Sequence, residues 1–224
     1  GKGITGISTR EEDFVKQIFT TSTHDTVLFF SNKGKLYRLR GYEIPEAGRT
    51  AKGTAIVNLL SLDAGEKISA IIPIQSFEDG KYLLMATKNG LIKKTPLKEY
   101  DSSRKTGLLA INLKDDDELI DVRLTDGEDN VVLVTSKGMC ITFDEKDVRP
   151  VGRSAQGVLG IRLDDDDFVI GMESILANNK NATLLAITEN GFGKRTEVDE
   201  YRVQNRGGRG VITYKITPKT GNIV

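Results

Sequence analysis

The stretch Tyr82-Leu83-Leu84-Met85-Ala86-Thr87-Lys88-Asn89-Gly90-Leu91-Ile92-Lys93-Lys94 decides the fold, because the chain contains four related copies of it. Every copy begins with a short apolar run, reaches a turn that ends in glycine, and continues as an apolar and basic strand. The other three copies are residues 27–38, 131–142 and 183–195. Glycine adopts the positive φ that a tight hairpin turn requires without steric cost. Each copy therefore predicts a β-hairpin.

A second glycine follows each hairpin glycine at a nearly constant distance. The hairpin and second glycines form the pairs 34/53, 90/107, 138/157 and 191/210. After each second glycine comes another apolar strand (54–60, 108–113, 158–163 and 211–216), and a last strand such as 67–73 or 118–124 completes the unit. Units of four strands are typical of blades repeated around an axis. We expect an all-β, propeller-like repeat of four-stranded blades that forms a single domain over 1–224; a β-sandwich whose glycine turns agree by coincidence is the alternative.

Composition excludes several classes of protein. The 224 residues are 38% hydrophobic and 29% charged, and no apolar run is long enough to predict a membrane-spanning helix or a secretory signal. With one cysteine, Cys140, and one histidine, His24, the chain offers neither an internal disulfide nor a structural zinc site. We therefore expect a cytoplasmic protein without a bound metal.

Recognisable catalytic motifs are missing from the sequence. It has no phosphate-binding loop, dinucleotide fingerprint, metalloprotease motif or nucleophile elbow, and His24 beside Asp25 has no accompanying nucleophile. Tyr42, Tyr100 and Tyr201 recur eight to ten residues after a hairpin glycine, which favours packing between blades. We expect no catalytic residue; a hydrolase on a repeat scaffold, which would need a clustered acid–base pair, is the alternative.

Charge is distributed unevenly along each repeat although the formal net charge is zero. The windows 33–53, 88–107, 137–157 and 189–210 hold 21 Lys and Arg residues against 11 Asp and Glu residues. The remainder is acidic and includes the runs 115–118 and 164–167, for which solvation of a turn is the interpretation and calcium binding the alternative. Rotation about the repeat axis would place the basic windows along one rim, which predicts salt-sensitive binding of duplex DNA through its phosphates. An ordinary solvated surface is the alternative.

The candidate DNA contacts lie mainly in the loops before the second glycines. Glycine beside arginine also lets backbone N–H groups approach a phosphate. The candidate residues are Lys2, Arg38, Arg40, Arg49, Lys52, Arg104, Lys105, Arg149, Arg153, Gln204, Arg206, Gly207, Gly208 and Arg209.

One of these loops carries a recognisable motif. Gln204-Asn205-Arg206-Gly207-Gly208-Arg209-Gly210 resembles the seven-residue box Gln-Arg-Arg-Gly-Gly-Lys/Arg-Gly of the C-terminal domain of the DNA gyrase A protein, although Asn205 stands where the box has arginine. Gly1-Lys2-Gly3 looks like the tail of another copy. The stretches 13–14, 23–25, 44–47, 56–60, 127–129 and 160–163 resemble the same domain in order.

The resemblance implies a β-pinwheel, a disc of about six four-stranded blades in which neighbours exchange strands. In that family the disc wraps double-stranded DNA in a right-handed sense and presents it to the N-terminal part of the same polypeptide. ATP-driven strand passage, which requires the gyrase B protein, then introduces negative supercoils. The resemblance thus implies a DNA-wrapping module without catalysis or a cofactor of its own, since other parts of the parent type IIA topoisomerase use ATP and magnesium.

Two further functions remain alternatives: the C-terminal domain of the corresponding topoisomerase IV protein, and a propeller-type scaffold for protein interactions, whose binding would not fall steeply with salt. Because four hairpins are present instead of six, we expect an incomplete pinwheel. Uncovered strand edges and apolar faces would favour self-association.

Overall fold

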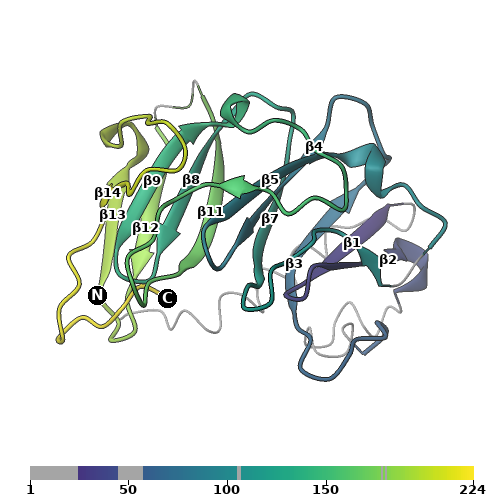
Figure 1. The fold of residues 1–224 in the computed structure, drawn as a ribbon, viewed down its shortest axis with the longest axis horizontal. Coiled ribbons are helices and arrows are strands. Elements are labelled where there is room, and N and C mark those ends of the chain that lie inside the picture. Colours follow the sequence, from purple (N-terminus) through teal and green to yellow (C-terminus); the bar gives the residue numbers. More distant parts are fainter. Residues whose placement is uncertain (1–24, 45–57, 105–106, 178, 180) are drawn as a thin grey trace.

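The computed structural model describes residues 25–44, 58–104, 107–177, 179 and 181–224, and within these ranges every long element is a β-strand (Figure 1). The strands are β1 Thr26–Ser31, β2 Lys35–Arg40, β3 Ile68–Ile74, β4 Tyr82–Thr87, β5 Leu91–Pro96, β6 Leu108–Leu109, β7 Leu119–Thr125, β8 Asp129–Thr135, β9 Met139–Asp144, β10 Val158–Leu159, β11 Val169–Leu176, β12 Thr183–Ile187, β13 Gly193–Glu197 and β14 Val211–Ile212. Four short 3-10 helices follow the hairpins: η1 Gly41–Glu43, η2 Leu97–Tyr100, η3 Glu145–Asp147 and η4 Val198–Glu200. The expected all-β class is confirmed. No helix in the described ranges has the length and apolar character needed to cross a bilayer.

Three antiparallel sheets of four strands follow one another across the molecule, in the orders β3-β1-β2-β6, β7-β4-β5-β10 and β11-β8-β9-β14 (Figure 1). Each sheet combines the hairpin and last strand of one repeat with the short strand of the next repeat. For example, β6 follows the second glycine of the second repeat but pairs with β2 of the first. Neighbouring blades therefore exchange strands, as the family resemblance implies. The hairpin β12–β13 forms a fourth, two-stranded sheet.

The exchanged strands are shorter than the sequence predicts. Residues 108–113, 158–163 and 211–216 were each expected to form a strand, but only two residues of each enter the ladder. The next two residues donate their N–H groups to the carbonyl oxygen of the hairpin glycine instead. Gly90 O accepts from Gly160 N at 2.8 Å and from Ile161 N at 3.2 Å. Gly34 and Gly138 accept an equivalent pair of hydrogen bonds. The close approach of main chain to main chain ends the regular ladder.

Gly90 shows why the hairpin turn requires glycine. Its φ is +94°, and a Cβ at this position would lie 2.6 Å from Ile161 O of the exchanged segment. Both the backbone conformation and the contact therefore exclude a side chain.

The hydrophobic core lies between neighbouring sheets rather than within one of them. Side chains alternate between the two faces of each strand. Along β4, Leu83 and Met85 pack in a cluster shared with the first sheet, whereas Leu84 and Ala86 pack in a cluster shared with the third. All four side chains are fully buried. Because both faces of β1, β4 and β8 are covered, these strands contain continuous apolar runs in the sequence.

Two of the three recurrent tyrosines pack as expected. Tyr100 and Tyr201 are buried, and Tyr100 Oη donates a hydrogen bond to Ala110 O of the exchanged segment at 2.9 Å. Tyr42 differs, because 69% of its surface is exposed. The prediction for Tyr42 was wrong: it follows its hairpin glycine by eight residues, and the buried place, ten residues after the glycine, belongs to Ile44.

Candidate nucleic-acid interface

Three segments leave one sheet, pair with the preceding sheet through β6, β10 or β14, and return to their own sheet. We call residues 101–114, 149–163 and 202–215 the crossover segments. Their sequences contain ten Lys and Arg residues and a single acidic residue, Asp101. Lys105, one of the ten, lies outside the described residues. The three crossover segments, where the chain passes from blade to blade, are therefore strongly basic.

Three arginines on these segments are exposed and free. In the part of the chain that the structure describes, the side chains of Arg149, Arg162 and Arg202 are exposed and make no hydrogen bond or ion pair. Long cationic side chains in this state can neutralise phosphates and release counterions. The sequence prediction included Arg149 but missed Arg162 and Arg202. Arg202 could have been found, since it follows its hairpin glycine by eleven residues, as Arg149 does.

Two predicted contact residues bind the protein's own main chain instead of pointing freely into solvent. Arg153 Nη1 donates a hydrogen bond to Leu109 O at 2.9 Å. Arg206 Nη1 donates to Leu159 O at 2.9 Å, and its Nε donates to Asp147 O at 3.1 Å. Both side chains are half-buried.

The other predicted side chains on the second and fourth repeats differ in exposure. Arg209 is exposed and lies 3.8 Å from Asp164, an exposed ion pair of little strength that leaves the guanidinium accessible. Arg104 is also exposed. Gln204 is half-buried, and its backbone N–H donates to Thr142 O at 2.7 Å.

The glycines of the box join the crossover segments to each other. Gly207 has a φ of +88°, and its N–H donates to Gly160 O at 2.8 Å. Gly208 O accepts from Arg162 N at 2.8 Å. The Gly207 N–H is therefore engaged within the chain.

The two candidates on the first hairpin are both anchored. The side chain of Arg38 is only 13% exposed; it lies over the Phe77 ring, 5.8 Å from the ring centroid, and its Nη1 is 3.9 Å from Asp101 Oδ1. Arg40 is exposed but donates a hydrogen bond from Nη1 to Thr26 Oγ1 at 2.8 Å. The remaining candidates, Lys2, Arg49, Lys52 and Lys105, lie outside the described residues.

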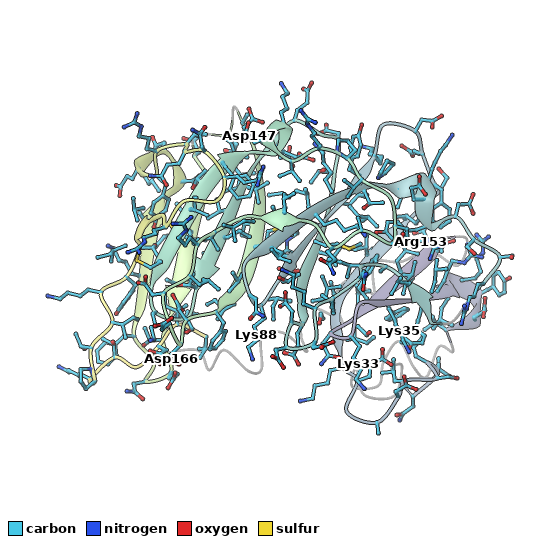
Figure 2. All side chains as sticks on the ribbon, in the orientation of Figure 1. Lys33, Lys35, Lys88, Asp147, Arg153 and Asp166 are labelled. Carbon is cyan, nitrogen blue, oxygen red and sulfur yellow. The ribbon has the colours of Figure 1, made fainter. Side chains whose placement is uncertain are left out.

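Several basic residues of the same windows lie at the opposite edge of the sheets. Figure 2 shows Lys33, Lys88 and Asp166 on one side and Asp147 on the other. Lys33 Nζ donates to Ala64 O at 3.1 Å, and Lys137 Nζ donates to Asp165 O at 3.1 Å. Lys33 and Lys137 are therefore bound to the main chain of the neighbouring turns.

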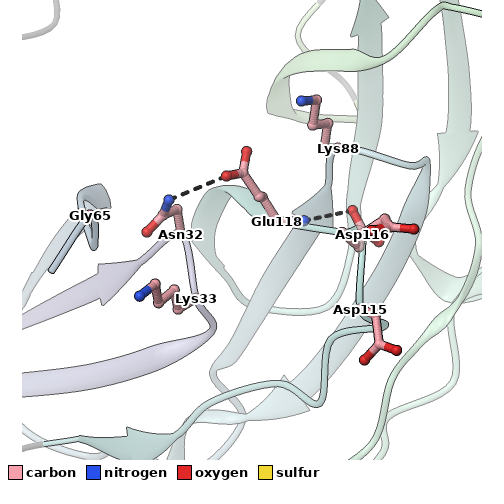
Figure 3. A pocket seen from close by; sticks show the side chains of 8 residues that line it. Asn32, Lys33, Gly65, Lys88, Asp115, Asp116 and Glu118 are labelled. Atoms are coloured by element: carbon pink, nitrogen blue, oxygen red, sulfur yellow. Dashed lines mark hydrogen bonds between the residues drawn. The ribbon is translucent and has the colours of Figure 1, made fainter. Parts of the chain in front are cut away.

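The acidic runs hold the hairpin turns through hydrogen bonds. Asp117 Oδ1 accepts from Asn89 N at 2.9 Å, and Asp167 Oδ1 accepts from Lys137 N at 3.0 Å. A hollow of about 380 Å³ beside the first run is lined by residues of both charges (Figure 3). Within the described ranges, no group of three His, Cys, Asp or Glu residues is placed to hold a metal ion.

Two lysines of the second hairpin are buried. Lys93 is 1% exposed, and its Nζ donates to Ala110 O at 2.7 Å and to Arg153 O at 2.5 Å. Burial, with repulsion from Arg153, lowers the pKa of Lys93 to about 7. Lys94 is also buried, which lowers its pKa, and its Nζ donates to Glu145 O at 3.1 Å. Neither ammonium group can reach a phosphate without leaving its site.

Comparison with known proteins agrees with this architecture. The profile of the family described as "DNA gyrase C-terminal domain, beta-propeller" matches residues 1–22, 25–75, 81–126, 129–175 and 182–224. The last four matched segments each begin at or just before a hairpin.

Curated relatives include the DNA gyrase A protein of Clostridium acetobutylicum, 56% identical over 224 residues, and that of Staphylococcus epidermidis, 47% identical over 225 residues. Both alignments cover all of this chain but only 27% and 25% of the relatives, so the chain spans about a quarter of their length.

Two solved structures are also similar. The C-terminal domain of a DNA topoisomerase IV is 35% identical, with a TM-score of 0.81 over 90% of this chain and 62% of its own. A DNA gyrase A C-terminal domain is 30% identical, with a TM-score of 0.75 over 91% of this chain and 65% of its own. Because the family profile matches nearly every residue, in segments that coincide with the structural repeats, the chain belongs to the DNA gyrase C-terminal domain family.

Proposed function

We propose that this chain binds duplex DNA without sequence specificity and wraps it in a right-handed sense along its crossover segments. The observation that carries the proposal is the charge of these segments, ten basic residues against one acidic residue, together with the exposed, free side chains of Arg149, Arg162 and Arg202. Successive blades repeat the surface, so a duplex that follows it meets cations at regular intervals and bends around the array.

Phosphate binding explains the residue types better than base recognition does. Arg149, Arg162 and Arg202 lie on loops, and no long helix is present in the described ranges to enter a major groove. Contacts to phosphate position DNA but carry no sequence information. We therefore assign the strength of binding to counterion release, which falls steeply with salt.

The relatives support a place for the chain in a larger enzyme. As the C-terminal part of a DNA gyrase A protein, the chain would present wrapped DNA to the N-terminal part of the same polypeptide in the cytoplasm. Strand passage, with the gyrase B protein and the ATP and magnesium that it needs, would occur elsewhere in that enzyme. This chain would contribute no catalytic residue and hold no cofactor.

A second candidate is the corresponding domain of topoisomerase IV, which the TM-score of 0.81 to such a domain favours. The 56% identity to a gyrase A protein and the motif at Gln204 to Gly210 favour gyrase.

The test is topological. Nicked circular DNA is ligated with increasing amounts of the chain, the protein is removed, and the linking number is read on a gel. We expect a positive, protein-dependent shift. Binding without a shift would refute wrapping, and no binding in low salt would favour the protein-interaction scaffold.

A pair of double variants locates the DNA surface. The slope of log Kobs against log salt is negative, and each phosphate contact adds roughly 0.9 to its magnitude. Arg149→Gln with Arg202→Gln should therefore reduce the magnitude of this slope by about two. Lys33→Gln with Lys88→Gln removes the same charge from the opposite edge and should leave the slope unchanged. The reverse result would place DNA on the acidic edge.

A further inference from the structure

The two half-buried arginines of the crossover segments occupy one repeated position. Arg153 and Arg206 each precede the second glycine of their repeat by four residues. Their acceptors, Leu109 O and Leu159 O, each follow the second glycine of the preceding repeat by two residues, and both hydrogen bonds measure 2.9 Å. The same donor thus binds the same acceptor at two successive blade junctions.

Main-chain hydrogen bonds join the crossover segments at the same places. Asn112 N donates to Ala155 O at 3.1 Å, and Arg162 N donates to Gly208 O at 2.8 Å. These two bonds also correspond in the repeat. Each donor follows the second glycine of its repeat by five residues, and each acceptor precedes the second glycine of the following repeat by two residues. The second and third crossover segments are therefore each bound to the preceding one by main-chain hydrogen bonds and by one arginine side chain.

A third contact at each junction binds a main-chain carbonyl group next to the arginine's acceptor. At the first junction the buried Lys93 ammonium bridges Ala110 O and Arg153 O. At the second junction Gly207 N–H binds Gly160 O, the counterpart of Ala110 O. Arg153 is thus held through its guanidinium and through its own carbonyl, which leaves little freedom to reach a ligand.

We propose that Arg153 and Arg206 are positioning residues that set the spacing between successive crossover segments, and thereby the path of the duplex, while the exposed arginines make the phosphate contacts. The inference rests on the proposed DNA-wrapping function. It divides the arginines of this surface into two groups with different measurable effects: positioning residues govern how DNA is wrapped, and exposed residues govern how many ions are released on binding.

The first experiment needs no DNA. Amide hydrogen exchange is measured for Asn112 and Arg162 in the wild-type chain, in the Arg153→Gln, Arg206→Gln double variant, and in the matched Arg149→Gln, Arg202→Gln control. We expect exchange at both amides to become about tenfold faster in the first variant and to stay unchanged in the control. Equal exchange in all three proteins would overturn the positioning role, whether or not the chain binds DNA.

The second experiment separates the two groups on DNA. The Arg153→Gln, Arg206→Gln variant should keep the wild-type salt slope but lose most of the linking-number shift per bound chain. The control should lose about two units of slope, as two phosphate contacts would require. A slope reduced by about two in the first variant, with the shift per bound chain preserved, would make Arg153 and Arg206 phosphate ligands and overturn the inference.

A charge-preserving variant excludes loss of charge or of folding as the cause. Arg153→Lys with Arg206→Lys retains both cations but lacks the planar guanidinium fork, so we expect the salt slope of the wild type and a reduced shift per bound chain. Full recovery of the shift by lysine would contradict the positioning role. If the wild-type chain itself neither binds nor wraps DNA, the proposed function fails, and hydrogen exchange alone decides the positioning role.

Discussion

At the scale of single residues, the burial of Lys93 has a consequence for stability. Its pKa is lowered from the usual 10.5 to about 7, chiefly by desolvation. Below about pH 7 the ammonium is charged in the folded and the unfolded chain, and the cost of burying it is fully present. Above that pH the unfolded chain binds a proton that the folded chain does not, so the free energy of unfolding rises with pH.

We therefore predict that Lys93→Met flattens the rise in stability between about pH 7 and pH 8.5, where one such group adds up to about 1.4 kcal/mol per pH unit. Urea unfolding at a series of pH values measures the slope. Lys94, whose pKa is also lowered, gives the wild type a contribution of the same sign that the variant retains. Lys98→Met, which removes the exposed ammonium of η2 that pairs with Asp79, is the control and should keep the full slope. An unchanged slope in Lys93→Met would contradict the prediction.

Single residues are also where sequence reasoning about the site reached its limit. Position in the repeat directed the prediction to the loops before the second glycines. It could not separate Arg149, which is free, from Arg153, which binds Leu109 O, because the acceptor lies 44 residues away in the chain. Because every residue has a backbone carbonyl, the sequence does not show which carbonyl accepts the hydrogen bond.

At the scale of elements, the exchanged strand depends on the glycine that receives it. Gly90→Ala should cost more than about 3 kcal/mol of unfolding free energy, because the new Cβ meets Ile161 O at 2.6 Å in addition to the strain of a positive φ. Gly191→Ala has a similar φ of +83° but open space around the Cβ, so it should cost only about 1–2 kcal/mol. Urea unfolding of the two variants makes the comparison, and equal losses would show that the exchanged segment can move away.

Elements differ in how far the sequence predicts them. The first three hairpins are clear because both faces of their first strands, β1, β4 and β8, are buried, which yields nearly unbroken apolar runs before the turn residues. The length of the exchanged strands is not clear from the sequence. Residues 108–113 have the composition of a strand, but only Leu108–Leu109 pair as a strand. Their end is set by hydrogen bonds to a glycine of another repeat, a tertiary effect that local composition does not encode.

At the scale of the whole molecule, zero net charge conceals an uneven distribution of charge along each repeat. The crossover segments hold nearly all their charge as Lys and Arg, whereas the turns that follow two of them contain the aspartate runs, one of which binds Lys137 through Asp165 O. Under the proposed function, each crossover segment contributes only part of the DNA-binding surface, because the segments recur from blade to blade. The number of phosphates contacted must then depend on how many blades the DNA spans.

This dependence yields a prediction about DNA length. The slope of log Kobs against log salt should grow in magnitude as the duplex is lengthened from about 10 base pairs, which is one helical turn. It should reach a plateau once the DNA spans the crossover surface. Fluorescence anisotropy with labelled duplexes of graded length, each titrated at several salt concentrations, measures it. Arg149→Gln and Arg202→Gln, on separate crossover segments, should lower the plateau by similar amounts and additively, since each removes one contact. A slope already maximal with the shortest duplex would mean that one blade binds DNA alone, and the repeated surface would then have no part in wrapping.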